Sequence, residues 1–275
     1  MTSPSPDGTG AEPAGGRALP AHFREKSPLT DTAGVSWSGR DYAPSPFPGD
    51  DGSTPPPVAA AQAAVGAGED PHRQALVAAL APSRLLVPIM AVATEEGTTA
   101  HGLTGDNGAD MAMVSITAPD GTRVLPVFTS AAALTAWRAD ARPVPVLTPQ
   151  AAQAAVQEGC TALLLDAASD PAAGGAVLLP RSVLWALAQG RDWVPPHEDG
   201  ELAAELSRIA ATVPPVVGLK ALTGERSEVD LLVGLPAGLD AAAVQDVTAR
   251  LGAALGESML VADRISSLRL RLAQA

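Results

Sequence analysis

The stretch Met111-Ala-Met-Val-Ser-Ile-Thr-Ala-Pro-Asp-Gly-Thr-Arg-Val-Leu-Pro-Val-Phe128 carries the strongest fold signal in this 275-residue chain. Its two ends, residues 111–117 and 124–128, are rich in residues that favour strands. Between them, Ala118-Pro-Asp-Gly-Thr122 supplies the residue types whose backbone preferences suit a tight turn. The stretch therefore predicts a β-hairpin.

Helix and strand patterns alternate on both sides of this hairpin. Asp70 is a suitable N-cap for a helix that begins near residue 71, and Pro82 ends it. A strand follows at residues 85–93, and Pro88 predicts an edge or a bulge, because proline cannot donate to a ladder.

Two later runs, residues 162–165 and 176–179, are apolar without alternation, which predicts two strands in the middle of a sheet. Residues 70–190 therefore form an α+β domain, a mixed β-sheet with packed helices.

Residues 191–200 are polar, hold two adjacent prolines and show no periodicity, which predicts a domain boundary. Beyond it, residues 200–275 predict a smaller α+β domain. Its closing strands are expected at residues 258–262 and 267–272, the last with its leucines toward a core and its arginines toward water.

The first 57 residues contain 11 proline, 8 glycine and 7 serine residues, which predicts a mostly disordered tail. Residues 37–52 stand out because they hold Trp37, Tyr42 and Phe47, which bury large apolar areas when they bind. The expected docking motif consists of these aromatic anchors and nearby charges, with the candidate interaction residues Trp37, Arg40, Phe47, Asp50 and Asp51. The alternative is a linker that binds nothing.

Charge and composition exclude several classes of protein. The formal net charge is −12, so nucleic acid and anionic membranes would be repelled. The longest apolar run, residues 85–93, is shorter than the roughly 20 residues of a membrane helix. The single cysteine, Cys160, allows no internal disulfide and fits a reducing compartment. We expect a cytoplasmic protein, with its oligomeric state left open.

The residues predict no complete catalytic, metal or cofactor site. Cys160 follows a predicted helix C-terminus, where the helix dipole disfavours a thiolate, so it is interpreted as structural. The most site-like segment is residues 94–110, interpreted as a ligand loop or as a solvated hairpin. Asp166, at the end of a strand, is the other candidate, with a structural turn as the alternative. The candidate ligand residues are Glu95, Glu96, His101, Asp106, Asp110 and Asp166.

Several strings resemble the SseB family, the enhanced serine sensitivity proteins, in their actinobacterial form. They include Arg84-Leu-Leu-Val-Pro-Ile89, Asp110-Met-Ala-Met-Val114, Leu125-Pro-Val-Phe-Thr-Ser130, Ala141-Arg-Pro-Val-Pro-Val146 and Leu187-Ala-Gln-Gly190. The resemblance covers residues 70–190 as an N-terminal SseB domain, and residues 200–275 resemble the C-terminal SseB domain. It implies a cytoplasmic protein linked to serine sensitivity, with no catalytic residues to carry over.

Two function hypotheses follow. The first is a noncatalytic interaction or regulatory protein with an unidentified protein partner. The second is an enzyme or small-molecule sensor in amino-acid or sulfur metabolism that uses residues 94–110 and Asp166.

Overall fold

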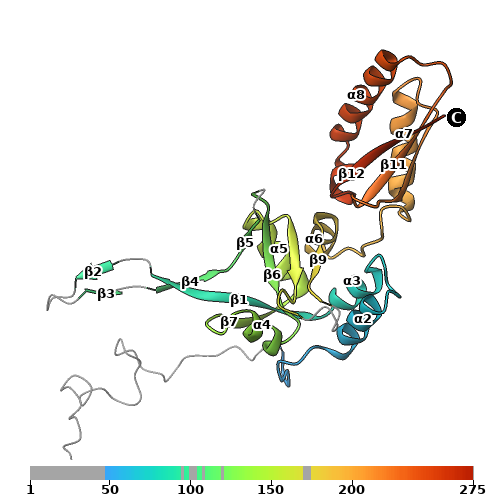
Figure 1. The fold of residues 1–275 in the computed structure, drawn as a ribbon. Helices are drawn as coiled ribbons and strands as arrows, with labels where there is room; N and C mark the ends of the chain where they lie inside the picture. Colours follow the sequence, from blue (N-terminus) through green and yellow to red (C-terminus); the bar gives the residue numbers. More distant parts are fainter. Residues whose placement is uncertain are drawn as a thin grey trace, which may run out of the picture. The chain divides into compact units, whose positions relative to one another are not determined.

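Strand β1 (Arg84–Ala93) is the centre of a three-stranded sheet in the computed structural model, which describes residues 47–93, 96–98, 104–106, 109–118, 121–169 and 175–274. It pairs with β4 (Ala109–Met113) and β7 (Arg142–Leu147), antiparallel to both (Figure 1). Pro88 lies opposite Pro143, so two residues without an N–H group face each other across one pair of strands. The sequence predicted an edge position or a bulge for residues 85–93; the edge position is wrong because β1 is the central strand, and its register with β7 runs without a bulge past Pro88.

A second, four-stranded sheet has the order β5 (Ile116–Thr117), β6 (Arg123–Val127), β8 (Ala162–Leu165) and β9 (Val177–Leu179). Strands β6 and β8 are parallel, whereas the outer pairs are antiparallel. An isolated bridge between Leu86 and Phe128 joins this sheet to β1. The sheet is therefore mixed, as predicted.

The predicted hairpin is confirmed only near its turn. Ile116 pairs with Val124, and Thr117 pairs with Arg123. Residues 111–113 pair instead with β1, because β4 belongs to the other sheet. The central position predicted for residues 176–179 is also wrong, since β9 is an edge strand and its Leu178 is exposed.

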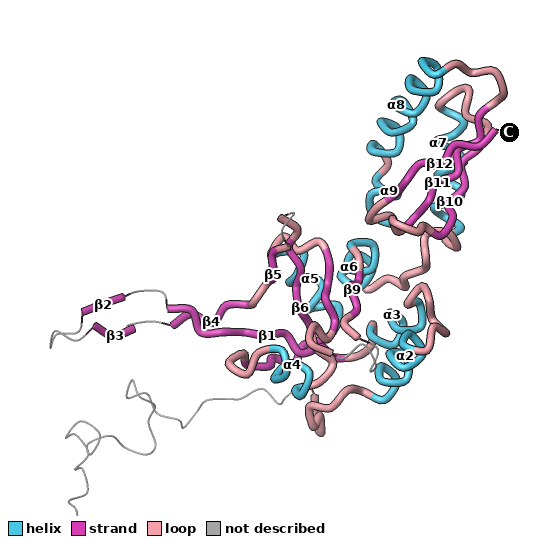
Figure 2. Tube along the Cα trace, viewed as in Figure 1, coloured by secondary structure: helices cyan, strands magenta, loops and turns pink. Residues whose placement is uncertain are grey.

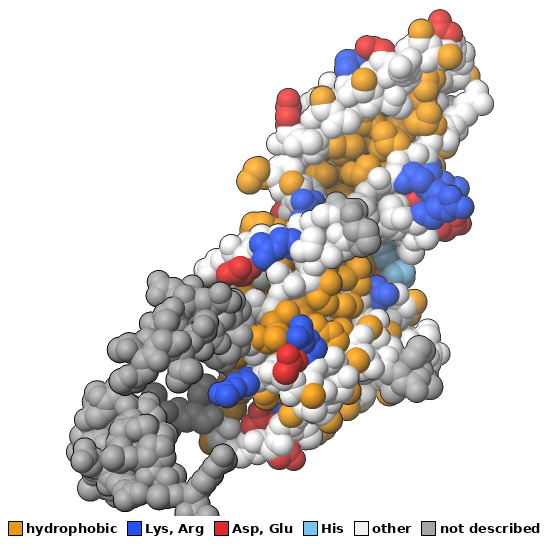
Figure 3. All heavy atoms as spheres, turned by 60° about the vertical axis from the view of Figure 1, so that its left-hand side comes forward, with side chains coloured by type: hydrophobic (Ala, Val, Ile, Leu, Met, Phe, Trp, Pro, Cys, Tyr) orange, Lys and Arg blue, Asp and Glu red, His pale blue; other side chains and the backbone are white. Residues whose placement is uncertain are grey.

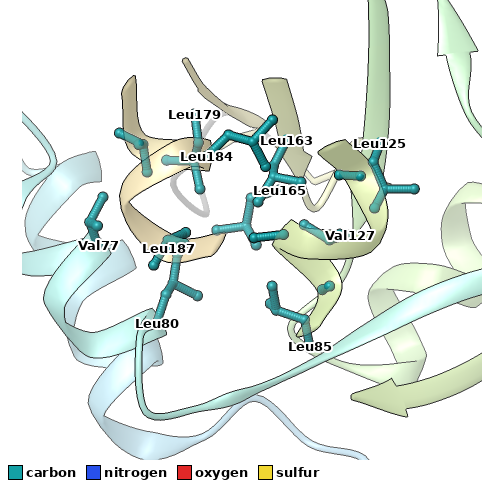
Figure 4. Close-up of a cluster of buried hydrophobic side chains, with 14 of the residues drawn as sticks. Val77, Leu80, Leu85, Leu125, Val127, Leu163, Leu165, Leu179, Leu184 and Leu187 are labelled. Atoms are coloured by element: carbon teal, nitrogen blue, oxygen red, sulfur yellow. The ribbon is translucent and has the colours of Figure 1, made fainter. Parts of the chain in front are cut away.

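Five helices of the described residues pack with these sheets. They are α2 (Pro56–Gly66), α3 (Gln74–Leu80), α4 (Ala131–Trp137), α5 (Thr148–Gln157) and α6 (Arg181–Ala188). The core between them is aliphatic, with Leu80, Leu125, Leu163 and Leu184 all fully buried (Figure 4). Each such leucine contributes about 1.5–3 kcal/mol of transfer free energy, so the core compensates for the scarcity of aromatic residues.

The N-terminal boundary of the folded part differs from the prediction. Helix α2 begins at Pro56, and its Val58 and Ala61 join the core, so the predicted tail of residues 1–57 extends too far. Residues 49–275 group together as one unit.

The C-terminal elements form a three-stranded sheet with helices. Their order is α7 (Gly200–Thr212), β10 (Gly218–Thr223), β11 (Val229–Leu235), α8 (Ala241–Glu257), α9 (Met259–Arg264) and β12 (Leu268–Gln274). Central strand β11 pairs antiparallel with β10 and parallel with β12 (Figure 2). Leu206, Leu231 and Leu251 belong to their buried core, which lies on the other side of residues 191–200 from the first core.

The predicted strand at residues 258–262 is wrong, because Met259–Arg264 form helix α9 and Ser258 caps it. The α+β class is confirmed by the mixture of helices and strands. The division into domains at residues 70–190 and 200–275 stays a prediction. No helix among the described residues is long and apolar enough to cross a membrane.

Candidate functional site

A buried polar network lies at the carboxyl ends of the parallel strands β6 and β8, with Asp166 at its centre. Asp166 directly follows β8, is almost fully buried and has a positive φ of 49°. Its Oδ1 accepts a hydrogen bond from the backbone N–H of Thr129 at 2.8 Å. Its Oδ2 accepts bonds from Thr129 Oγ1 at 2.8 Å and from Gln62 Nε2 at 2.7 Å. The carboxylate therefore ties the segment after β6 and helix α2 to the end of β8.

Arg84 extends this network to residues 50–54, which we call the strap. The side chain is buried at the first position of β1. Its Nε and Nη2 bind both carboxylate oxygens of Asp50, at 2.7 and 2.9 Å. Nη2 also donates to Ser53 O at 2.6 Å, and Nη1 donates to Thr129 O. The hydrogen bonds from Arg84 hold the pKa of the Asp50 carboxyl below its usual range, so this carboxyl is ionised near neutral pH.

Two further bonds hold the strap against the domain. Gly52 O accepts the backbone N–H of Ala131 at 2.8 Å, in the first turn of α4. Thr54 Oγ1 lies 2.9 Å from Thr129 Oγ1, within hydrogen-bond distance. The strap therefore contacts the segment that follows the carboxyl end of β6, and this end of the strands is where open α/β sheets commonly bind ligands.

The chemistry of this network favours a structural role. Asp166 already accepts three hydrogen bonds, and Asp50 is paired with Arg84. A general acid or base must exchange its proton with a substrate, and the buried Asp166 has no free face for that role, whereas the partly exposed Asp50 is held in a bidentate pair with Arg84. The described residues include no group of three His, Cys, Asp or Glu side chains that could hold a metal ion.

The network includes two of the residues singled out in the sequence, Asp50 and Asp166, and joins them through Arg84 and Thr129. Asp51 lies beside it, where its Oδ1 accepts the N–H of Ser53 at 2.9 Å. Phe47 is partly buried next to the strap in sequence. Trp37 and Arg40 lie outside the described residues.

The candidate ligand loop contains two short strands, β2 (Glu96–Thr98) and β3 (Thr104–Asp106), paired antiparallel with Glu96 opposite Asp106. Asp110 lies in β4, opposite Val92. Glu95 and His101 lie outside the described residues. Residues 96–98 and 104–106 therefore pair as a hairpin, and a ligand role for the segment stays a prediction.

Sequence reasoning missed Arg84, Thr129 and Gln62. Only Arg84 gave a signal, as a charged residue directly before the apolar run of residues 85–93. Cys160 is buried, and burial raises the pKa of its thiol, as its interpretation as a structural residue requires.

An exposed apolar groove lies between helices α6 and α9, which we call the Trp185 groove. It has a volume of about 570 Å³ and is lined by Arg181, Trp185, Gln189, Met259, Leu260, Ala262 and Asp263. Trp185 is 38% exposed and Met259 is 85% exposed, both high values for large apolar side chains. At the polar rim, Gln189 Nε2 donates to Asp263 Oδ1 at 3.0 Å, and Arg191 pairs with the same carboxylate at 2.9 Å. Apolar side chains are exposed in several patches of the surface (Figure 3).

The fold and the site together define an α+β domain in which a polar network around the buried Asp166 and Arg84 holds an N-terminal strap in place. Residues 58–186 match the family model described as the SseB protein N-terminal domain. This part of the chain is therefore an SseB N-terminal domain, as the sequence strings predicted. The match ends before the C-terminal elements. Neither a curated protein nor a solved structure matches the chain.

Proposed function

We propose that this chain is a noncatalytic, cytoplasmic interaction or regulatory protein that binds a partner protein with the Trp185 groove. The observation that carries the proposal is the exposure of two large apolar side chains, Trp185 and Met259, that line the same groove. Tryptophan and methionine are enriched at the centres of protein interfaces, and contiguous exposed apolar surface marks binding sites.

The composition of the groove supports a protein rather than a small polar ligand. Four of its seven lining residues, Trp185, Met259, Leu260 and Ala262, are apolar, and we refer to the charged ones, Arg181 and Asp263, as its rim residues. Both rim residues already have internal contacts, because Arg181 Nη2 donates to Ile265 O at 2.8 Å and Asp263 binds Arg191. An apolar centre with a polar rim is the usual arrangement of a binding surface for a protein.

The C-terminal elements enter the proposal as a C-terminal SseB-like domain. The support is the weaker resemblance of residues 200–275 and their separate buried core. The proposed link to serine sensitivity rests on the family resemblance. In this proposal, the partner protein is the cell component through which the chain affects sensitivity to serine.

The test is capture of the partner by the full chain from an extract of its source cells, followed by mass spectrometry. Met259→Glu places a charge on the groove without removing a buried contact, so it should abolish capture. Leu178→Glu is the matched control, since Leu178 is 51% exposed on β9 and does not line the groove. A partner retained equally by Met259→Glu would refute the assignment of the groove.

A further inference from the structure

Strand β12 is the outermost strand of the C-terminal sheet, and β11 pairs with only one side of it. The backbone N–H of Val229 donates to Ser267 O at 3.2 Å, which fixes the direction of the peptide groups. Because these groups alternate along a strand, those of Arg269 and Arg271 face β11, and those of Leu268, Leu270 and Leu272 face the open edge. In the part of the chain that the structure describes, no strand pairs with this edge.

The side chains of β12 alternate between two faces of the sheet. Leu268, Leu270 and Leu272 are in register with Val229, Leu231 and Val233, which belong to the core under the helices. The cover is incomplete, because Leu268 is 37% exposed and Leu272 is 48% exposed. Part of the apolar surface on the helix-covered face is therefore exposed to solvent along the unpaired edge of β12.

Two hollows lie along this apolar side of β12. One, of about 320 Å³, is lined by Leu268 and Leu270 together with Gly252 and Gly256 of α8. The other, of about 300 Å³, is lined by Leu272 with Leu239 and Val244 among others. At both glycines a Cβ atom would meet nothing within 4 Å, so the helix leaves open space above the edge. An added strand would point alternate side chains toward these hollows.

The opposite face of the sheet is basic. Arg269 Nη2 lies 2.5 Å from Asp230 Oδ2, and Arg271 Nη1 lies 3.6 Å from the same oxygen. Lys220 is in register with Leu232, which is in register with Arg271, so a third cation lies on this face. Two acidic residues offset part of this positive charge. They are the buried Asp230 and the exposed Glu225, which lies 3.9 Å from Arg269. The face keeps a positive excess, although the whole chain has a net charge of −12.

This charge pattern argues against a second copy of the chain as the occupant. Antiparallel pairing of β12 with itself, centred on Leu270 or on Arg271, puts an arginine of one copy opposite an arginine of the other. Like charges directly opposite each other destabilise a strand pair, and charged residues on an edge strand discourage self-association.

We propose that β12 is a docking strand, to which an extended segment of another protein with alternating apolar and acidic residues adds as a fourth strand. The apolar residues would lie beside Leu268 and Leu272, and the acidic residues beside Arg269 and Arg271. Backbone hydrogen bonds would supply affinity, and the alternation would supply specificity. The inference rests on the proposed function, because it takes the chain to be an interaction protein. It concerns a different surface from the Trp185 groove.

The first test is binding of a fluorescein-labelled eleven-residue peptide that alternates valine and glutamate to the full chain, followed by fluorescence anisotropy. Two reference peptides alternate valine and lysine, or contain valine and glutamate in separate blocks. We expect saturable binding of the alternating acidic peptide, about tenfold tighter than either reference, from two or three favourable cross-strand pairs. No binding of that peptide, or equal binding of the block peptide, would overturn the proposal.

Variants locate the site. Arg271→Glu changes a side chain that is 53% exposed and should weaken binding about tenfold. Arg208→Glu on α7 makes the same charge change at a more exposed position and should leave binding unchanged. Leu272→Pro removes an N–H group at the open edge and should abolish binding, whereas Leu272→Val keeps that group and should retain it. Circular dichroism and thermal melts verify that each variant is folded.

Met259→Glu separates the two proposals. This variant should lose the captured partner and still bind the alternating acidic peptide. If the peptide binds but Met259→Glu keeps its partner, only the groove proposal fails. If Arg271→Glu and Leu272→Pro bind the peptide as well as the wild type does, only the β12 proposal fails.

Discussion

Arg84 joins two parts of the SseB N-terminal domain to the strap that precedes it through one guanidinium group. It starts β1, binds both oxygens of Asp50 in the strap and donates to Thr129 O after β6. Arginine suits this place because its planar fork of donors matches a carboxylate and a carbonyl at once. A lysine at this position would keep the charge but lose the bidentate geometry.

Arg84→Leu is expected to destabilise the domain by about 1–3 kcal/mol, because it leaves the buried Thr129 O without its donor and removes the pair with Asp50. Urea denaturation of the full chain measures this loss. Arg138→Leu breaks an exposed ion pair with Asp140 and should cost less than about 1 kcal/mol. Equal losses in the two variants would contradict the role assigned to the network.

The pairing of Asp50 with Arg84 also predicts a dependence of stability on pH. The Arg84 hydrogen bonds hold the pKa of Asp50 in the folded chain below its unfolded value of about 3.9. The stabilisation is therefore complete above pH 5 and is lost as the pH falls through the folded pKa. The difference in unfolding free energy between wild type and Asp50→Asn should be constant from pH 7 to 5 and shrink below about pH 4. A difference that grows on acidification would contradict this assignment.

Sequence reasoning found the ends of this network but not its connections. Asp50 and Asp166 were identified from local patterns, since one lies near aromatic residues and the other ends an apolar strand. Their partners are 34, 37 and 104 residues away in the chain, so the contacts depend on the register of the sheets. Single-sequence periodicity carries no information on such long-range pairing.

At the scale of secondary-structure elements, the starts of helices were easier to predict from the sequence than the structure adopted by short apolar runs. Asp70 was predicted as the N-cap of a helix from residue 71; it accepts the N–H groups of Gln74 and Leu76, but helix α3 begins only at Gln74, with Arg73 as its N-cap. Ser130 and Asp240 accept N–H groups in the first turns of α4 and α8, as their residue types favour. Helix α2 was missed because prolines 55–57 were interpreted as part of a disordered tail, although proline is well tolerated in a first helical turn. Helix α9 was taken for a strand because a run of five residues is too short to show a period.

The N-cap residues of helices α8 and α7, Asp240 and Asp199, allow a comparison of how much each contributes to the free energy of unfolding. Asp240→Ala removes an exposed cap of α8 and should cost about 1 kcal/mol. Asp199→Ala removes the cap of α7 and also the buried partner of Arg264, whose Nη1 lies 2.6 Å from Asp199 Oδ2. We expect a loss of about 3 kcal/mol or more in this variant, measured by urea denaturation. A smaller loss for Asp199→Ala than for Asp240→Ala would contradict the importance of the Arg264 pair.

At the scale of the whole molecule, two separate buried cores lie on either side of residues 191–200. Hydrogen bonds of Arg181 with Ile265 O, and of Gln189 and Arg191 with Asp263, cross the predicted boundary, and residues 49–275 group as one unit. Separate folding of residues 70–190 and 200–275 therefore stays a prediction. Limited proteolysis of the native chain should cut at residues 191–200 before it cuts inside residues 111–128. Early cleavage within β6, detected by mass spectrometry, would show that the first unit is less stable than its core implies.

The central claim is that the Trp185 groove is the contact surface for a partner protein, and site-specific photo-crosslinking tests it most directly. The photoreactive amino acid p-benzoylphenylalanine replaces Met259 in the full chain, inside the source cells, and a matched chain carries it at Leu178. We predict a discrete covalent adduct with one partner protein at position 259 and no such adduct at position 178. Absence of an adduct at position 259, or the same adducts at both positions, would contradict the claim.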